Sequence, residues 1–218
     1  MKTSWLRLAA VVGLSIGALL IPIGVSAGGG IDSGTSVYRS SGQVAQLYFD
    51  VPDPANPCLD TNGFVFGGNF KNTSPGAPSS ADSVGGVFVY RSDNCAGTSS
   101  GVFYKGSLPA GALQIEKTLS SASLSTTVSG RDENGNDVPI TIDLAWTATG
   151  PLSTEDSSFH YRQPGVNVVT RSSGDTRQAQ ANGTLTVGDD ALAISSQGSL
   201  QSDRNFYVSV CYSSSGCK

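Results

Sequence analysis

Residues 138–150 read VPITIDLAWTATG and alternate between apolar and polar side chains along almost their whole length. In an extended chain, one side of this stretch carries only apolar residues, which are Ile140, Ile142, Leu144, Trp146 and Ala148. The other side carries three threonines, Asp143 and Ala145. A period of two is the pattern of a β-strand that buries one face and leaves the other in water. The stretch therefore predicts a strand of antiparallel sheet with Trp146 in the core.

The neighbouring segments extend this pattern into hairpins. The run ASLSTTVSG, residues 122–130, also alternates, and the link that follows contains Asn134-Gly135, which tolerates positive φ at both central positions of a tight turn. Residues 122–149 are therefore predicted to form one long hairpin. A second hairpin is predicted with its bend at residues 187–190. The final strand is predicted over NFYVSVCY, residues 205–212, with inward side chains at Phe206, Val208 and Val210.

The remainder of the chain repeats the alternation between turn signals, and almost no stretch has apolar residues at helical spacing. In QVAQLYFDV, residues 43–51, Leu47, Phe49 and Val51 share one face, while Tyr48 and Asp50 lie on the other. Roughly ten short strands without helical crossovers predict an all-β fold, an antiparallel β-sandwich. The alternative is a closed or partly open β-barrel, because closure also limits exposed strand edges.

The N-terminal stretch, residues 1–27, has the order of a secretory signal peptide. The cations Lys2 and Arg7 precede an apolar run, and the run ends in small residues up to Ala27. The run is also long enough for an uncleaved membrane anchor, although three glycines and a proline interrupt it. We prefer cleavage after Ala27. Residues 28–218 are then a single all-β domain that is secreted, either extracellular or periplasmic.

The charge of the chain excludes some partners. There are 13 Lys and Arg against 17 Asp and Glu, and removal of residues 1–27 changes the formal charge from −4 to −6 because only two cations are lost. An acidic chain lacks the broad positive field that a phosphate backbone requires, so we expect no nucleic-acid partner. No second long apolar run follows the signal peptide, so we expect no membrane partner after cleavage. The sequence leaves the oligomeric state open.

One short region departs from this acidic balance. Arg162, Arg171 and Arg177 lie close together in the chain, with Asp175 near them. On a strand, they form either an anion-binding strip or an ordinary solvated sheet face. The solvated face is the commoner outcome, so the sequence assigns no ligand to them.

The four cysteines, Cys58, Cys95, Cys211 and Cys217, all follow the predicted cleavage site. An even number in an exported chain predicts disulfides. We expect Cys58 to pair with Cys95, tying the ends of a polar surface loop over residues 72–83, and Cys211 to pair with Cys217. A zinc site is not predicted, because C-x-x-C spacing is absent and the chain has one histidine.

Each motif with the outline of a catalytic or metal site also has an ordinary structural explanation. GTSSG, residues 97–101, matches a nucleophile elbow around Ser99, but strand-like rather than helical sequence follows it. His160 is interpreted as a polar residue near a strand end. DENGND, residues 132–137, has the alternate oxygens of a calcium loop but lacks the glycine expected at its sixth position. We therefore assign no catalytic residue, no cofactor and no metal ligand.

Paired carboxylates remain a possible source of catalysis, because two acids can hydrolyse a glycosidic bond. Spacing along an antiparallel sheet does not show which acids meet in space. A small secreted polysaccharide hydrolase is therefore the alternative function, and a structural envelope or matrix component is a further one. The available acids include Asp50, Asp53, Asp143, Glu155 and Asp156.

The preferred function is non-catalytic binding outside the cell, with carbohydrate or another extracellular surface as the partner. A sugar ring packs its apolar face against an exposed aromatic ring. Because Trp146 is assigned to the core, the candidates for a ligand face are Tyr48 and Tyr207, which lie on the polar sides of their strands.

The predicted export gives a first test. Expression in a secreting host should yield a mature chain that begins at Gly28, because the small residues before it fit a signal peptidase. Intact mass and N-terminal sequencing of the exported protein measure this directly. A chain that retains residues 1–27 in the membrane fraction would support the anchor instead.

Overall fold

The computed structural model describes residues 35–53, 55–74, 76–163 and 166–211. Every regular element in these ranges is a β-strand, and every strand pairing is antiparallel. The predicted all-β antiparallel class is therefore confirmed. The strands belong to one compact unit, Ile31–Lys218. Among the described residues, no helix is long and apolar enough to cross a bilayer.

The strands follow one another with short connections. In chain order they are β1 (Thr35–Pro52), β2 (Leu59–Thr73), β3 (Ser80–Asp93), β4 (Thr98–Ser107), β5 (Leu113–Ile115), β6 (Ser121–Asp132), β7 (Asp137–Ala148), β8 (Ser153–Gln163), β9 (Val166–Val187) and β10 (Asp190–Cys211).

All of these strands join one sheet that returns on itself. The order is β10-β1-β2-β3-β4-β6-β7-β9-β8, and β10 also pairs with β9, which makes the arrangement ring-like. The contact between β4 and β6 is short, with only two residue pairs. Strand β9 is long enough for two strands to pair with it one after the other along the same edge. Residues 166–176 pair with β8, and residues 179–187 pair with β7.

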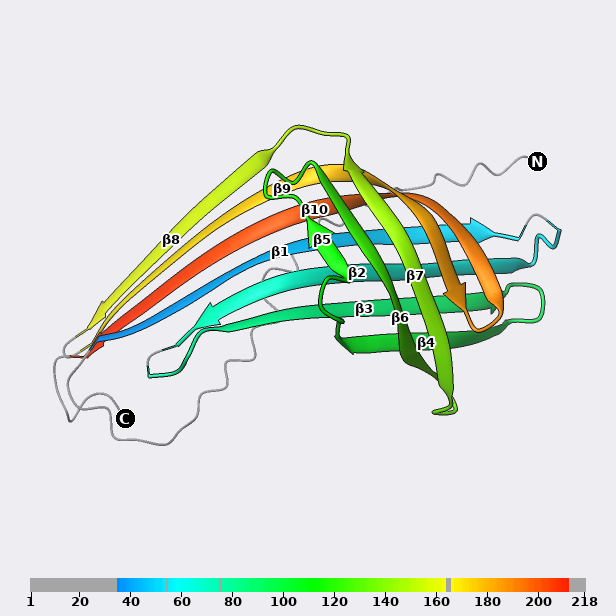
Figure 1. The fold of residues 1–218 in the computed structure, drawn as a ribbon, viewed down its shortest axis with the longest axis horizontal. Helices are drawn as coiled ribbons and strands as arrows, with labels where there is room; N and C mark the ends of the chain where they lie inside the picture. The colour runs from blue at the N-terminus through cyan, green and yellow to red at the C-terminus, as the bar shows by residue number, and fades with distance from the viewer. Residues whose placement is uncertain (1–34, 54, 75, 164–165, 212–218) are drawn as a thin grey trace, which may run out of the picture. The chain divides into compact units, whose positions relative to one another are not determined.

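Two layers of this sheet face each other across the core. Strands β6 and β7 cross β2–β4 at a steep angle (Figure 1). Trp146 on β7 is 1% exposed, and its indole N–H donates a hydrogen bond of 3.2 Å to the carbonyl of Gln46 on β1. Gly198 on β10 leaves room beside this indole, since a Cβ there would lie 3.0 Å from Trp146 Nε1. The predicted core position of Trp146 is confirmed, and the facing layers pack as a sandwich does.

Both predicted hairpins form, but the first has a different turn. Strands β6 and β7 pair from Ser121↔Thr147 to Arg131↔Asp137. In the link, only Gly135 has positive φ, at 83°, and Asn134 does not share it. The Asp132 carboxylate accepts from the backbone N–H groups of Asn134 and Asn136 at 2.9 and 2.8 Å. A side-chain cap therefore replaces the two positive-φ residues of a tight turn. The second hairpin bends at Gly188, as predicted.

The Cys58–Cys95 disulfide is confirmed, but it does not hold the loop that we expected it to hold. The two Cα atoms are 5.3 Å apart, with Cys58 directly before β2 and Cys95 two residues after the end of β3. The polar segment 72–83 lies at the opposite end of the β2–β3 hairpin, where Asn72 pairs with Ser80. The loop is shorter than predicted because its polar residues continue both strands.

Several predictions lie outside the described residues. These are the signal peptide over residues 1–27, the partner Cys217, and the side chains of Phe206, Val208, Val210 and Cys211, whose backbones alone are described. The Cys211–Cys217 pairing and the division into residues 1–27 and 28–218 stay predictions.

Gly183 offers a test of the β7–β9 packing. It has φ of 146°, and a Cβ at this position would collide with the backbone carbonyl of Asp143 on β7. We expect Gly183→Ala to lower the free energy of unfolding by about 2 kcal/mol or more, because this region of φ is essentially restricted to glycine. Urea denaturation measures the loss.

Gly101→Ala is the matched control for this change. A Cβ there meets only the ring of Tyr90, at 3.2 Å, and that ring is exposed and can move. Its effect should stay within about 1 kcal/mol. Equal stability of the Gly183→Ala protein and the wild type would contradict the described register.

Candidate functional site

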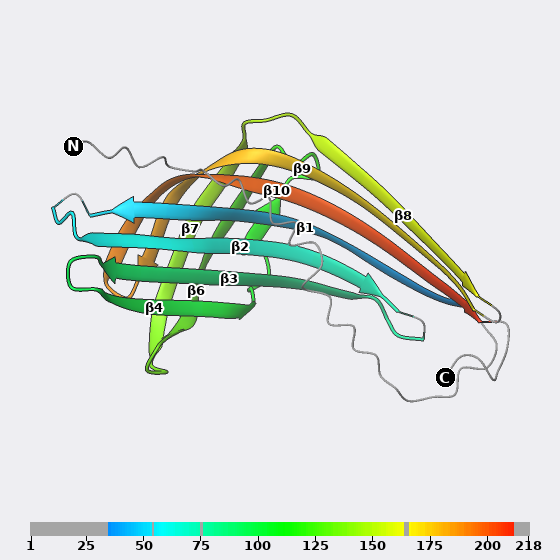
Figure 2. The same cartoon turned by 180° about the vertical axis from the view of Figure 1, so that it is seen from behind.

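The outward side of β1–β4 carries aromatic side chains in cross-strand register. Tyr48 on β1 pairs with Phe64 on β2, Phe64 pairs with Phe88 on β3, and Phe88 pairs with Phe103 on β4. Seen from behind, these four strands lie in front of β6 and β7 (Figure 2). The row therefore crosses the sheet on the side away from the core.

Alternation explains why these rings point outward. On the same strands, the residues next to them, which include Leu47, Phe49, Val65 and Val87, are buried in the core. Successive side chains of a strand point to opposite faces, so a buried neighbour on each side sends the ring outward. Tyr48, between Leu47 and Phe49, is the clearest case.

The rings contact one another and stay accessible to solvent. Tyr48 and Phe64 have centroids 4.5 Å apart, and Phe88 lies 4.8 Å from Tyr90 and 6.5 Å from Phe103. Tyr48 is 59% exposed, Phe88 42% and Phe103 49%. An exposed cluster of this kind marks an interaction surface more often than a scattered apolar residue does. We call it the outer aromatic face, which consists of Tyr48, Phe64, Phe66, Phe88, Tyr90 and Phe103.

Two of the rings lie directly over glycines. Phe66 pairs with Gly86, and a Cβ on Gly86 would lie 2.9 Å from the Phe66 Cζ atom. Tyr90 pairs with Gly101 in the same way, with Cε1 at 3.2 Å. Each ring therefore lies over a glycine and close to the backbone, a known way to cover a glycine in a sheet.

Two carboxyl groups stand at one end of the outer aromatic face. Asp50 lies two residues after Tyr48 on the same side of β1, and Asp60 lies on the paired part of β2. The hydrogen bond to Asp60, together with burial and the charge of Asp60, raises the pKa of Asp50 above its ordinary value. The Oδ1 atom of Asp60 is buried, and no hydrogen-bond partner for it is found among the described residues. When Asp50 is protonated, its O–H is the donor of this hydrogen bond.

The acids considered for hydrolysis are not brought together as a catalytic pair. Asp53 accepts hydrogen bonds from two backbone N–H groups in the turn after β1. Asp143 lies on β7, and Glu155 and Asp156 are consecutive residues of β8. Asp50 meets Asp60, which the sequence did not single out. Because these two carboxyl groups share a hydrogen bond, they are closer than the separation of about 5 Å or more between the carboxylates of glycosidases.

The remaining motifs have structural roles in the described part of the chain. Ser99 lies within strand β4 and pairs with Ser92, so the strand-to-helix turn of a nucleophile elbow is missing around it. His160 on β8 shares a hydrogen bond of 2.6 Å with Asn167 on β9. Asp132 serves as the cap of its hairpin turn, and its hydrogen bonds with Asn136 lower its pKa.

A cysteine and acid cluster is explained by the disulfide. Cys58, Asp93 and Cys95 bring potential ligand atoms within 4.8 Å of one another. Both sulfur atoms are bound to each other, and a metal requires thiolates. Asp93 accepts from the backbone N–H groups of Cys95 and Ala96, both at 2.9 Å. The cluster is therefore a closed loop rather than an ion site.

The structure separates the two predicted tyrosines. Tyr48 belongs to the outer aromatic face, whereas the backbone of Tyr207 pairs with Tyr38. Tyr38 precedes Tyr48 by ten residues on β1, which is about 33 Å along an extended strand. The side chain of Tyr207 lies outside the described set, so its assignment to a ligand face stays a prediction.

Sequence reasoning missed Phe64, Phe88 and Phe103. In FVFGGNF and VGGVFVYR, apolar residues occupy both sides of the strand, so alternation does not show which side is inside. The available signal was the glycines two or three residues from these phenylalanines, because a glycine in a strand often allows another group to approach closely.

Comparisons with known proteins do not identify the chain. No protein-family model matches it, and no curated protein matches it. Among solved structures, an AttH-like protein from Nitrosomonas europaea is 15% identical over 80% of this chain and 52% of that one, with a TM-score of 0.26. This chain thus spans about half the length of that protein. An acetoacetate decarboxylase-like enzyme from Sphingomonas wittichii RW1 is 13% identical over 89% and 97%, with a TM-score of 0.22. At these scores neither likeness carries an argument.

The Asp50–Asp60 pair predicts a defined titration. In Asp60→Asn the pKa of Asp50 should fall, because the carboxylate that accepts its proton and repels its charge is gone. The folded wild type holds this proton more tightly than the unfolded chain. Its stability should therefore fall as the pH rises from the ordinary aspartate pKa through the raised pKa of Asp50.

NMR titration of the Asp50 carboxyl carbon measures this shift. Asp143→Asn is the control, since Asp143 is exposed on another strand and should leave the Asp50 midpoint unchanged. An unchanged midpoint in Asp60→Asn would show that the two carboxyl groups do not interact.

Proposed function

We propose that this protein is a secreted, non-catalytic binding protein that holds carbohydrate on its outer aromatic face. The observation that carries the proposal is the in-register row of outward rings across β1–β4, three of which are exposed while Phe64 is half-buried. The Cys58–Cys95 disulfide is compatible with an oxidising compartment, where such bonds persist. Export itself rests on the signal-like residues 1–27.

The surface has the chemistry that a sugar chain needs. Neighbouring strands are about 4.8 Å apart, so the row presents an apolar track at regular steps. The rings over Gly86 and Gly101 lie close to the backbone, which leaves space above them for the apolar face of a pyranose. Burying such rings against a ligand removes apolar area from water and stabilises the complex.

Polar groups flank this track on the same outward side. Gln46 lies beside Tyr48 on β1 and donates its amide to the Ser199 hydroxyl at 3.1 Å. Asp50 and Asn62 pair across β1 and β2 at the end of the row. Amide, hydroxyl and carboxyl groups at the rim can form hydrogen bonds to sugar hydroxyls and set the orientation of the ligand.

The geometry favours binding over hydrolysis. The two carboxyl groups near the aromatic row hydrogen-bond to each other, which leaves no space between them for a glycosidic bond. The outer aromatic face lies on the side of β1–β4 away from the core, and hydrolysis requires a substrate held between two acids.

The test uses a glycan array and purified residues 28–218, which include every described strand. Tyr48→Ala and Phe88→Ala should each lower the affinity for a glycan that the wild type binds by roughly fivefold or more, because each removes one stacking ring. Phe159→Ala is the matched control, since Phe159 is 60% exposed but lies on β8 away from the row. Thermal unfolding confirms that all three variants fold.

Three outcomes would overturn the proposal. The first is the absence of glycan binding by the wild type. The second is a loss of glycan affinity in Phe159→Ala as large as the loss in Tyr48→Ala or Phe88→Ala. The third is self-association through the same rings, which light scattering would reveal as a dimer that Phe88→Ala dissociates.

A further inference from the structure

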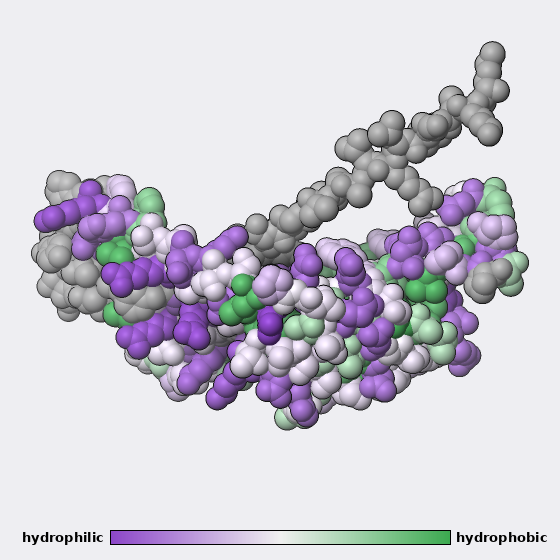
Figure 3. All heavy atoms as spheres, turned by 90° about the horizontal axis from the view of Figure 1, so that it is seen from above, coloured by the Kyte–Doolittle hydropathy of each residue, from purple (hydrophilic) through white to green (hydrophobic). Residues whose placement is uncertain are grey.

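The inward side of the sheet continues past the core into a polar surface. The first half of β9, the second half of β10 and the first part of β1 extend beyond the buried cluster, with β8 and the end of β2 at their sides. Figure 3 shows hydrophilic residues gathered toward the left end, where β8–β10 lie in Figure 1. No described residue of this part belongs to the outer aromatic face.

Four cations occupy four adjacent strands on this inward side. Arg204 on β10 pairs with Ser173 and Ser41, so its diagonal neighbours two residues away are Arg171 on β9 and Arg39 on β1. Arg39 in turn pairs with Thr73, two residues from Lys71 on β2. Diagonal neighbours lie about 7–8 Å apart at their Cα atoms. We call this zigzag, Arg171, Arg204, Arg39 and Lys71, the cation ladder.

The register places all four on one side. Ala45 and Leu200 pair with each other, both are buried, and the odd residues of β1 and the even residues of β10 share their side. Arg39 and Arg204 follow this parity. Arg171 shares the parity of the buried Ala179, and Lys71 that of the buried Val65. All four side chains are exposed to solvent.

Charge on this surface opposes the charge of the whole chain. Six of the ten described cations face inward here, and the acids of the same side are Asp156 and Asp175. The chain as a whole carries −4. A local cluster of one sign creates a field that a net charge does not reveal. The six cations are Arg39, Lys71, Arg162, Arg171, Arg177 and Arg204.

Three of the four ladder cations have no ion-pair partner within the described ranges. The recorded ion pairs, Arg91–Asp190 and Arg131–Asp137, lie elsewhere, and within the described ranges Lys71, Arg171 and Arg204 join no ion pair. Asp175 is held by the Thr154 hydroxyl at 2.6 Å. Arg177 differs from the ladder, because it donates to the carbonyl groups of Gly150 and Thr118 at 3.3 Å.

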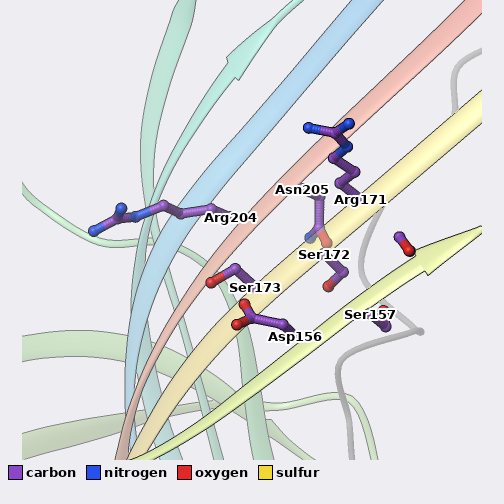
Figure 4. A pocket seen from close by; sticks show the side chains of 8 residues that line it. Asp156, Ser157, Arg171, Ser172, Ser173, Arg204 and Asn205 are labelled. Atoms are coloured by element: carbon purple, nitrogen blue, oxygen red, sulfur yellow. The ribbon is translucent and has the colours of Figure 1, made fainter.

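A hollow lies on the β8–β10 part of this surface. Its volume is about 430 Å³, and its lining comes from three adjacent strands (Figure 4). Arg171, Arg204 and Asp156 contribute the charged groups. Ser158 and Ser173 contribute hydroxyls on the inward parity. Hydroxyls beside guanidinium groups can donate to and accept from the hydroxyls of a sugar.

We propose that the cation ladder binds an acidic polysaccharide, whose carboxylate or sulfate groups meet Arg171, Arg204, Arg39 and Lys71. The inference rests on the proposed function, because it names a second, acidic carbohydrate for the same binding protein. Guanidinium groups bind oxyanions through two parallel hydrogen bonds, and a repeating polyanion contacts several of them at once. The ladder and the outer aromatic face use opposite sides of β1 and β2, so both can be occupied together.

The sequence indicated part of this surface. Arg162 and Arg171 face inward as an anion-binding strip would require, but Arg177 is used to hold the loops at residues 118 and 150. Arg39, Lys71 and Arg204 were missed because they come from strands far apart in the chain. Pairing of β9, β10, β1 and β2 brings them together.

The experiment measures binding to immobilised dextran sulfate and polygalacturonate, with uncharged dextran as the reference polymer. Arg171→Gln/Arg204→Gln should weaken binding to at least one acidic polymer on the order of tenfold, because two charge-assisted contacts are lost. Rising NaCl should weaken the wild type as well. Lys117→Gln/Arg131→Gln is the matched control, since it removes two exposed cations outside the ladder.

The proposal is overturned by wild-type protein that binds neither acidic polymer, by an equal loss in the control pair, or by tighter binding to single-stranded oligothymidylate. Separate readouts keep the two proposals apart. Tyr48→Ala should retain binding to the acidic polymer. A glycan array that detects no binding to the outer aromatic face would therefore leave the proposal for the cation ladder unaffected. Loss of the ladder would likewise leave the array result unchanged.

Discussion

The structure depends on burial of one side of a single antiparallel sheet. Trp146 shows this constraint most directly, because it is buried between layers and its indole N–H donates across the core to the carbonyl of Gln46. An indole donor placed in an apolar interior requires such a partner. This contact brings β7 against β1, and the close approach at Gly198 is needed beside it. Once these strands meet, alternation assigns every other residue of β1–β4 to the outside.

The two candidate surfaces follow from the same rule. On β1, Leu47 and Phe49 are buried, so Tyr48 between them must face water, while Arg39 shares the inward parity but lies beyond the core. The strands are longer than the buried cluster, and their excess length turns the inward side into a solvated surface. One face of the sheet therefore changes from apolar to cationic along a single strand, and the other face carries the aromatic row.

The carboxyl pair illustrates how local pairing sets chemistry. Asp50 and Asp60 are ten residues apart in the chain and meet because β1 and β2 form a hairpin. Their contact raises the pKa of Asp50, through the hydrogen bond to Asp60, burial and the charge of Asp60. This pair differs from the separated acids of a glycosidase.

The sequence by itself determined the strands, the antiparallel class, the core position of Trp146 and the Cys58–Cys95 bridge, because period-two alternation and export-linked cysteines are local signals. It also identified Tyr48, whose neighbours leave it only the outward side. Only the tertiary structure decided that Phe64, Phe88 and Phe103 align with Tyr48, and that Arg39 and Lys71 join Arg171 and Arg204. The reason is physical: register between strands depends on which apolar sides are buried together, and a strand that is apolar on both sides does not reveal this.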